Sequence, residues 1–151
     1  MGPFVLKENI MSDYKKDCVF CNIGLHYIPS YTLYEDDDVL AFLDINPVSY
    51  GHALVISKKH YDNFLDCPKD IMHKVMDVAQ RIGQVAIVQL GAKGVNILAN
   101  CNEAAGQEVK HFHVHVIPRY EAADNFKIEM KGNSEGLNLP AIAEAIKKDL
   151  N

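Results

Sequence analysis

Residues 111–117 read His-Phe-His-Val-His-Val-Ile, a strict alternation of histidine and apolar side chains. Successive side chains of a β-strand point to opposite faces, so the alternation predicts a strand with one histidine face and one apolar face. The apolar face can pack against a core, whereas three imidazoles on one face are costly to bury without partners. A purely structural reason for such an array is hard to find. The pattern therefore predicts that the histidine face carries chemistry.

Two kinds of chemistry fit a row of three histidines, metal binding and catalysis. His111 and His115 lie four positions apart, which is about 13 Å along an extended strand and too far for one metal ion. At most two adjacent histidines could share a metal. Neutral imidazole is a competent nucleophile near physiological pH, with an unperturbed pKa of about 6.5. We therefore expect the middle residue, His113, to act as a nucleophile that its neighbours tune.

The rest of the chain predicts an α+β fold. Strands are expected over residues 32–35, 39–45, 52–57, 94–100 and 111–117, the last one ended by Pro118. They fall into adjacent pairs on either side of one long helical segment. This order favours an antiparallel sheet covered by a helix over alternating parallel units.

The long helical segment is recognised by its apolar periodicity. Ile71, Val75 and Ala79 recur four residues apart, Pro68 suits a helix start, and the helix is expected to run to about Gly91. A turn or short helix is expected over residues 17–26 and a short helix over residues 140–150. The apolar stripe of the latter, Ile142, Ile146 and Leu150, is interpreted as packing rather than as a partner surface.

Composition indicates a soluble globular protein. The chain has 151 residues, of which 48% are hydrophobic and 23% charged. Its formal net charge of −5 argues against nonspecific binding to nucleic acid, which needs basic surface for the phosphates. No apolar run reaches membrane-spanning length and no signal peptide is evident, so we expect a cytoplasmic protein. Residues 1–16 are expected to form a flexible extension and residues 17–151 one domain.

Cys18 and Cys21 have the spacing of a zinc-binding pair. Without a secretion signal the compartment is expected to be reducing, which disfavours disulfides. A tetrahedral zinc site needs two more ligands, for which His60 and His111 are the best candidates; the alternative is a pair of reduced thiols in a turn. The acidic run at residues 35–38 is interpreted as a solvated turn rather than a second metal site.

The loop before the histidine strand contains groups suited to phosphate. Gly106 lets the backbone approach an anion closely, and Gln107 and Asn100 carry amides that can stabilise charge on a phosphoryl oxygen. Alone, this loop reads as a simple hairpin turn. Beside three histidines it supports phosphoryl-transfer chemistry.

Together these motifs resemble the histidine-triad (HIT) family. Residues 111–117 match its signature, in which histidine alternates with apolar residues, at every position. The resemblance covers about residues 17–119 and includes the cysteine pair, Leu-Ala-Phe-Leu-Asp at 40–44, Gly-His at 51–52, Lys-Lys-His at 58–60 and Ala-Gly-Gln at 105–107. The cysteine pair and the Ile-Pro-Arg ending at 117–119 are similar to zinc-containing microbial members of the histidine-triad nucleotide-binding branch.

The resemblance implies a HIT-like fold, with a five-stranded antiparallel sheet, one long helix and a short C-terminal helix, in a homodimer with a continuous sheet. It implies a nucleotidyl-histidine intermediate on His113, a carboxylate at Asp44 that binds the ribose hydroxyls, and apolar walls around the base. The implied site residues are, for catalysis, His113, His115, His52 and Gln107; for the substrate, Asp44, Asn100, Glu108, Phe20, Ile23, Phe42 and Ile45; and for a structural zinc, Cys18, Cys21, His60 and His111.

The implied activity is that of a nucleotide hydrolase or transferase acting at the α-phosphate, with a purine nucleoside phosphoramidase as the preferred reading. Three alternatives remain open: a dinucleoside polyphosphate hydrolase or phosphorylase, a nucleotide-binding scaffold with vestigial catalysis, and a purely structural zinc protein. Glu108 stands where several phosphoramidases carry serine, and a carboxylate there would repel phosphate unless it points away or meets a cationic leaving group. His115 stands where the uridylyltransferase branch carries glutamine, which favours hydrolysis over sugar-nucleotide transfer.

Overall fold

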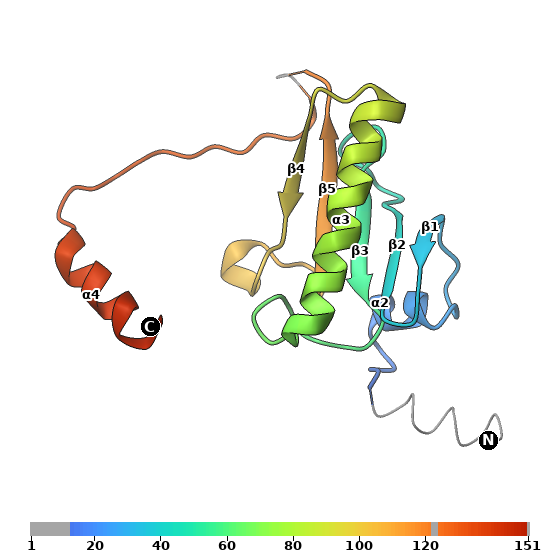
Figure 1. Ribbon diagram of the computed structural model, residues 1–151, viewed down its shortest axis with the longest axis horizontal. Helices are drawn as coiled ribbons and strands as arrows, with labels where there is room; N and C mark the ends of the chain where they lie inside the picture. Colours follow the sequence, from blue (N-terminus) through green and yellow to red (C-terminus); the bar gives the residue numbers. More distant parts are fainter. Residues whose placement is uncertain (1–12, 122–123, 151) are drawn as a thin grey trace.

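The computed structural model describes residues 13–121 and 124–150, in which one long helix covers a five-stranded antiparallel sheet (Figure 1). The strands are β1 (Thr32–Glu35), β2 (Val39–Leu43), β3 (Ala53–Ser57), β4 (Gly94–Leu98) and β5 (His113–Arg119); the helices are α2 (Val19–Gly24), α3 (Lys69–Leu90) and α4 (Leu139–Leu150), with a short 3-10 helix, η1 (Glu103–Ala105). The strand order is β1-β2-β3-β5-β4. The predicted α+β class and sheet are confirmed. The first twelve residues of the predicted extension lie outside the described residues.

The main core lies between α3 and one face of the sheet. Val114 and Val116 of β5 are fully buried there. Because strand residues alternate between faces, His113 and His115 point to the opposite face, where Phe20 of α2 packs in a second buried cluster. The sheet therefore separates a structural face under α3 from a face that carries the histidines.

The bounds of α3 agree with the prediction. Pro68 directly precedes the helix, and Gly91 follows it with a φ of 74°, in the left-handed region that glycine favours at a helix end. No helix among the described residues combines the length and the apolar character needed to cross a membrane.

His111 is not part of β5, which corrects the prediction of a strand over 111–117. The chain bends at this point: the His111 amide donates to the Val109 carbonyl at 2.9 Å, and the Phe112 amide donates to the Tyr61 carbonyl at 2.7 Å. These hydrogen bonds replace the sheet ladder before His113. Only His113 and His115 therefore stand side by side on the strand, and the His111 ring is free to point elsewhere.

The strand ends also differ from the prediction at several places. β5 continues through Pro118, because β3 pairs with β5 only as far as Val116 and a proline beyond that point removes no hydrogen bond to β3. β2 and β4 stop earlier than predicted, at Leu43 and Leu98. The residues that follow β2 and β4 form loops at opposite ends of the sheet, because β2 runs in the direction of β5 and β4 runs against it.

Residues 36–38 of the acidic run form the turn between β1 and β2, as predicted, and Glu35 is the last residue of β1. Asp36 accepts hydrogen bonds from the amides of Asp38 and Val39, each at 2.8 Å. The carboxylate of Glu35 forms an ion pair with Lys58, which directly follows β3. The carboxylates thus have amide and ammonium partners.

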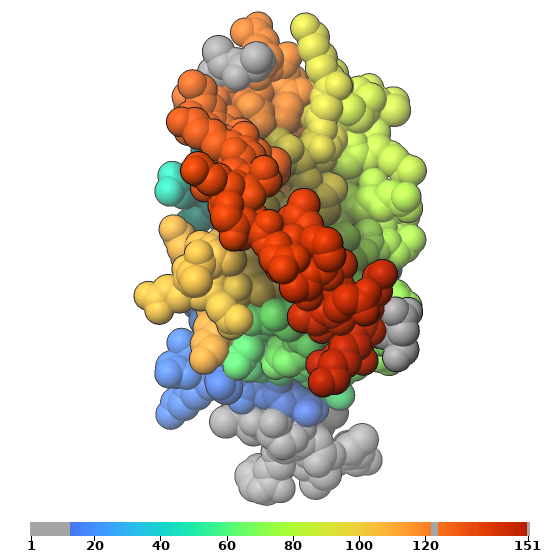
Figure 2. Space-filling view, turned by 90° about the vertical axis from the view of Figure 1, so that its left-hand side faces the viewer, coloured from blue at the N-terminus to red at the C-terminus, as the bar shows by residue number. Residues whose placement is uncertain are grey.

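The C-terminal helix α4 stands away from the sheet at the end of an extended segment (Figure 1). Figure 2 shows this segment and α4 in front of the rest of the molecule. None of the described residues of α4 is buried, and Ile142, Ile146 and Leu150 are 43%, 60% and 75% exposed. The prediction that this stripe packs against the rest of the chain is therefore wrong for the single chain.

Candidate active site and metal centre

A cleft of about 260 Å³ opens on the sheet face that carries the histidines. It is lined by His113 and His115 of β5 and by His52, which directly precedes β3. A larger hollow of about 700 Å³ lies near Arg119, at the far end of β4 and β5, and no histidine lines it. The smaller cleft is therefore the candidate active site, because the groups capable of chemistry converge on it.

His113 is held in one tautomer. Its Nδ1 lies 2.7 Å from the carbonyl oxygen of His111. A carbonyl can only accept a hydrogen bond, so Nδ1 carries the proton and Nε2 keeps its lone pair. Burial lowers the pKa of His113, which keeps the ring neutral near pH 7. The ring is 7% exposed, with its centroid 5.0 Å from that of Phe20. Nε2 thus keeps a lone pair on a neutral ring.

His52 and His115 form a hydrogen-bonded pair beside His113. The Val48 amide donates to His52 Nδ1 at 3.2 Å, so His52 carries its proton on Nε2. That proton is donated to His115 Nδ1 at 2.9 Å. His115 in turn keeps its proton on Nε2. Burial, and then the neighbouring rings of His113 and His52, lower the pKa of His115 to about 4. His115 is therefore a neutral hydrogen-bond donor that lines the cleft.

Asp44 and Asn100 border the cleft from opposite sides of β5. Asp44 directly follows β2 and is half-buried, with Oδ2 3.7 Å from His52 Nε2. Asn100 lies just beyond β4, and its Nδ2 donates to the Gly106 carbonyl at 3.4 Å. Gly106 has a φ of 92°, a backbone conformation that favours glycine, and this lets the loop close against Asn100.

The side-chain amide of Gln107 does not face the cleft, which corrects its predicted catalytic contact. Nε2 donates to the carbonyls of Asp62 at 2.6 Å and Val109 at 3.0 Å. Oε1 accepts from the Asn102 amide at 2.7 Å. Since both ends of the amide are engaged with backbone, Gln107 fixes the loop that carries Glu108, which does line the cleft.

The four apolar residues predicted to wall the base pocket have different positions. Phe20 lines the cleft. Ile23 and Phe42 are buried behind it in the same cluster. Ile45 is 83% exposed, because β2 ends at Leu43 and the chain leaves the sheet before Ile45. The prediction for Ile45 is therefore corrected, since its side chain faces solvent.

Six further apolar residues, none of them predicted from the sequence, line the cleft: Val48, Leu54, Leu98, Val109, Ile117 and Phe126. Period-two alternation identifies Ile117, which lies two residues after His115. Strand pairing places Leu54 and Leu98 on either side of His115, but the register of the strands could not be predicted from the sequence. No sequence pattern points to Phe126.

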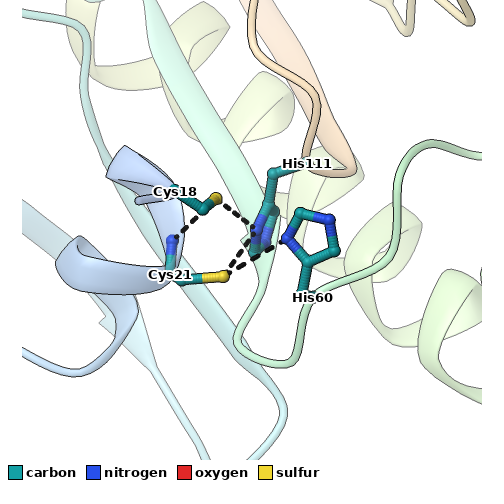
Figure 3. Close-up of side chains that lie close together, drawn as sticks. All are labelled: Cys18, Cys21, His60 and His111. Carbon is teal, nitrogen blue, oxygen red and sulfur yellow. Dashed lines mark hydrogen bonds between the residues drawn. The ribbon is translucent and has the colours of Figure 1, made fainter. Parts of the chain in front are cut away.

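Cys18, Cys21, His60 and His111 converge on one point from α2, the segment after β3 and the bend before β5 (Figure 3). Their ligand atoms all lie within 4.8 Å of one another. Cys18 Sγ is 3.3 Å from His111 Nδ1, and Cys21 Sγ is 3.3 Å from His60 Nδ1. A hydrogen bond from Cys21 lowers the pKa of Cys18 to about 3, which makes that sulfur a thiolate. Two sulfurs and two imidazoles at this spacing suit a tetrahedral zinc, with Zn–S near 2.3 Å and Zn–N near 2.0 Å.

The outer contacts of the two histidines point their Nδ1 atoms at the sulfurs. His111 Nε2 lies 2.6 Å from the Ser57 carbonyl, and His60 Nε2 lies 3.0 Å from Asp62 Oδ1. Each contact places the proton on Nε2 and leaves an Nδ1 lone pair, as in metal-binding histidines. The cluster therefore could hold a metal ion. His111 also connects both sites, because its carbonyl orients His113.

Comparison with known proteins agrees with this arrangement. The HIT domain family model matches residues 26–122. An uncharacterised HIT-like protein of Methanocaldococcus jannaschii is 41% identical over 130 residues, which is 86% of this chain and 98% of that protein. Adenylylsulfatase HINT3 of Arabidopsis thaliana is 39% identical over 110 residues, which is 73% of this chain and 56% of that protein.

Solved structures of histidine-triad proteins and of other similar chains share this fold. The structure of SMU.412c from Streptococcus mutans has a TM-score of 0.85 at 39% identity, over 93% of this chain and 90% of that chain. A zinc-bound histidine triad family protein from Mycobacterium smegmatis has a TM-score of 0.68 at 36% identity, over 88% of this chain and 98% of that chain. Sequence, fold and family model therefore agree, and the chain belongs to the histidine-triad (HIT) family.

Proposed function

We propose that this protein hydrolyses nucleotide derivatives at the α-phosphorus through a covalent intermediate on His113, and that nucleoside phosphoramidates are its preferred substrates. The observation that carries the proposal is the tautomer of His113. Its Nδ1 proton is bound by the His111 carbonyl, so a neutral Nε2 lone pair is available in a cleft lined by His115. A positioned neutral imidazole is suited to nucleophilic catalysis.

In the first step, Nε2 of His113 attacks the α-phosphorus and the bond from phosphorus to the leaving amine breaks. The leaving nitrogen takes a proton from the solvent, and the neutral His115 donates a hydrogen bond from its Nε2–H to a phosphoryl oxygen. The imidazolium formed on His113 keeps its Nδ1–H on the His111 carbonyl, which stabilises the new positive charge. In the second step, water attacks phosphorus, the bond to His113 breaks, and the proton lost by the water passes to the solvent. The product is a nucleoside monophosphate.

The charges of the cleft favour an amine over a polyphosphate as leaving group. Of the described residues that line the cleft, none is lysine or arginine, and Glu108 adds a carboxylate. A polyphosphate leaving group carries several negative charges that need cationic partners. A leaving amine is neutral or cationic and suits the carboxylate of Glu108. This charge balance favours phosphoramidates.

The nucleoside is proposed to lie on the side of the cleft formed by α2 and the end of β2. There the half-buried carboxylate of Asp44 can accept hydrogen bonds from the ribose hydroxyls, and the ring of Phe20 offers an apolar wall for a purine. Asn100 is proposed to contact the phosphoryl oxygens from the β4 side. The name adenylylsulfatase of the Arabidopsis relative supports an adenylyl substrate.

Cys18, Cys21, His60 and His111 are proposed to bind a structural zinc. The chemistry of the donor set supports this, as does the zinc-bound relative from Mycobacterium smegmatis. Zinc would join α2 to the segments before β5 and would keep the His111 carbonyl in place. It takes no part in the bond-breaking steps.

The protein is also proposed to form a homodimer. Among the described residues, β4 has a strand on only one side, and α4 exposes its apolar stripe. Open strand edges and unpaired apolar helices are both suited to a second copy. Sedimentation equilibrium at micromolar concentration is expected to give twice the mass of the chain, and a monomer at that concentration would contradict this assembly.

A direct comparison of substrates tests the proposed function. AMP release from an adenosine phosphoramidate is expected to be at least about tenfold faster, in kcat/KM, than from a diadenosine polyphosphate. Glu108→Gln is expected to lower the ratio of kcat/KM for the phosphoramidate to kcat/KM for the polyphosphate. The neutral amide no longer repels an anionic leaving group as the Glu108 carboxylate does. A polyphosphate preference in the wild type would instead favour a dinucleotide-cleaving enzyme. Absence of turnover of either substrate would favour a nucleotide-binding role.

A further inference from the structure

The chain after β5 is tied back to the sheet by one arginine. Arg119 Nε donates to Asp124 Oδ2 at 3.2 Å, Nη1 to Asn96 Oδ1 at 2.8 Å and Nη2 to the Phe126 carbonyl at 2.6 Å. Asp124 also accepts from the Tyr120 amide at 2.8 Å. The guanidinium thus joins β4, β5 and the segment that follows β5.

This arrangement fixes the side chain of Phe126 as well as its backbone. The guanidinium carbon of Arg119 lies 5.4 Å from the centre of the Phe126 ring, within the range of a cation–π contact. The ring is half-buried and lines the same cleft as His113 and His115. An aromatic residue in an otherwise exposed segment is therefore held at the candidate active site, and the reaction steps above do not use it.

Phe126 lies on the side of the cleft away from the proposed nucleoside position. β5 runs between β3 and β4, and Leu98 of β4 pairs opposite His115. Ile117 shares the His115 face of β5. Leu98, Ile117 and Phe126 thus form an apolar end of the cleft, whereas Asp44 lies at the end of β2.

We propose that Leu98, Ile117 and Phe126 form a leaving-group subsite that takes the apolar, preferably aromatic, part of an amine. This inference rests on the proposed function, which places the nucleoside at Asp44 and leaves the β4 side of the cleft for the leaving group. Three apolar side chains offer no hydrogen bonds and are suited to a hydrocarbon group. The fixed ring of Phe126 adds a surface for an offset or edge contact with an aromatic ring. Arg119 acts as a positioning residue for Phe126.

The test compares the benzylamine and methylamine phosphoramidates of AMP. In the wild type, kcat/KM is expected to be at least about tenfold higher for the benzylamine compound, because its ring is removed from water in the subsite. Phe126→Ala is expected to lower the ratio of kcat/KM for the benzylamine compound to kcat/KM for the methylamine compound at least about fivefold. Phe126→Leu is expected to lower this ratio less, since leucine keeps apolar volume without the ring. Met130→Ala, at an 87% exposed position of the same segment, is the matched control and keeps the wild-type preference.

Equal preference in the wild type and Phe126→Ala would overturn the subsite, as would a wild type that does not distinguish the two amines. Affinities measured by calorimetry with the inactive His113→Ala protein separate this failure from failure of the proposed function. Tighter binding of the benzylamine compound, lost when Phe126→Ala is added, supports the subsite whether or not the wild type turns the compound over. Equal affinity for both compounds in His113→Ala would overturn it.

Discussion

His113→Ala is expected to lower kcat for an adenosine phosphoramidate at least about a thousandfold, while the affinity for AMP changes by less than about threefold. The imidazole is the only proposed group that bonds to phosphorus, so its loss removes the covalent route. The nucleoside contacts proposed for Asp44 and Phe20 remain in place. Steady-state release of AMP and calorimetric binding of AMP measure the two quantities separately.

His73→Ala is the matched control for this variant. His73 is an exposed histidine on α3, which covers the opposite face of the sheet. Its loss removes an imidazole of the same kind without touching the cleft, and turnover is expected to stay at the wild-type level. Turnover by His113→Ala comparable with that of His73→Ala would refute a nucleophilic role for His113.

Cys21→Ser is expected to release the metal and to lower the melting temperature by about 10 °C. Cys21 is fully buried, and its sulfur lies between His60 and His111 in the cluster. Loss of one sulfur ligand would leave an incomplete tetrahedral set, so α2 would lose its proposed link to the segment before β5. Activity is expected to fall as well, because the His111 carbonyl orients His113. Elemental analysis and thermal unfolding, with and without a chelator, give the readouts.

Cys67→Ser provides the control for the cysteine substitution. Cys67 is half-buried against the core under α3 and belongs to neither cluster of site residues. It is expected to retain a full complement of zinc. If the purified wild type holds no zinc after growth in zinc-containing medium, or if Cys21→Ser unfolds at the wild-type temperature, a structural zinc is contradicted.

Much of the local chemistry of the site could be predicted from the sequence, because it depends on short-range patterns. The alternation in residues 111–117 correctly placed His113 and His115 on one face of a strand and Val114 and Val116 in the core. The same alternation was wrong for His111. Hydrogen bonds to Val109 and Tyr61 bend the chain before His113, and that bend depends on contacts with distant segments.

The parts of the site that depend on long-range contacts could not be predicted. Gln107 lies in the loop where it was expected, but its side-chain amide donates a hydrogen bond to the backbone carbonyl of Asp62, which is distant in the sequence. Phe126 reaches the cleft only because Arg119 binds its carbonyl, and no periodic pattern encodes that contact. Ile45 faces solvent because β2 ends before it, and strand ends are set by pairing with neighbouring strands.

Trapping the covalent intermediate is the decisive test of nucleophilic catalysis by His113. The wild type is mixed with an adenosine phosphoramidate, quenched in alkali, in which phosphorus–nitrogen bonds to histidine survive, and digested for mass spectrometry. An adenylyl group is expected on the peptide that contains His113, located on that residue and absent from His113→Ala. Turnover without any adenylated peptide, or adenylation on another residue, would contradict nucleophilic catalysis by His113.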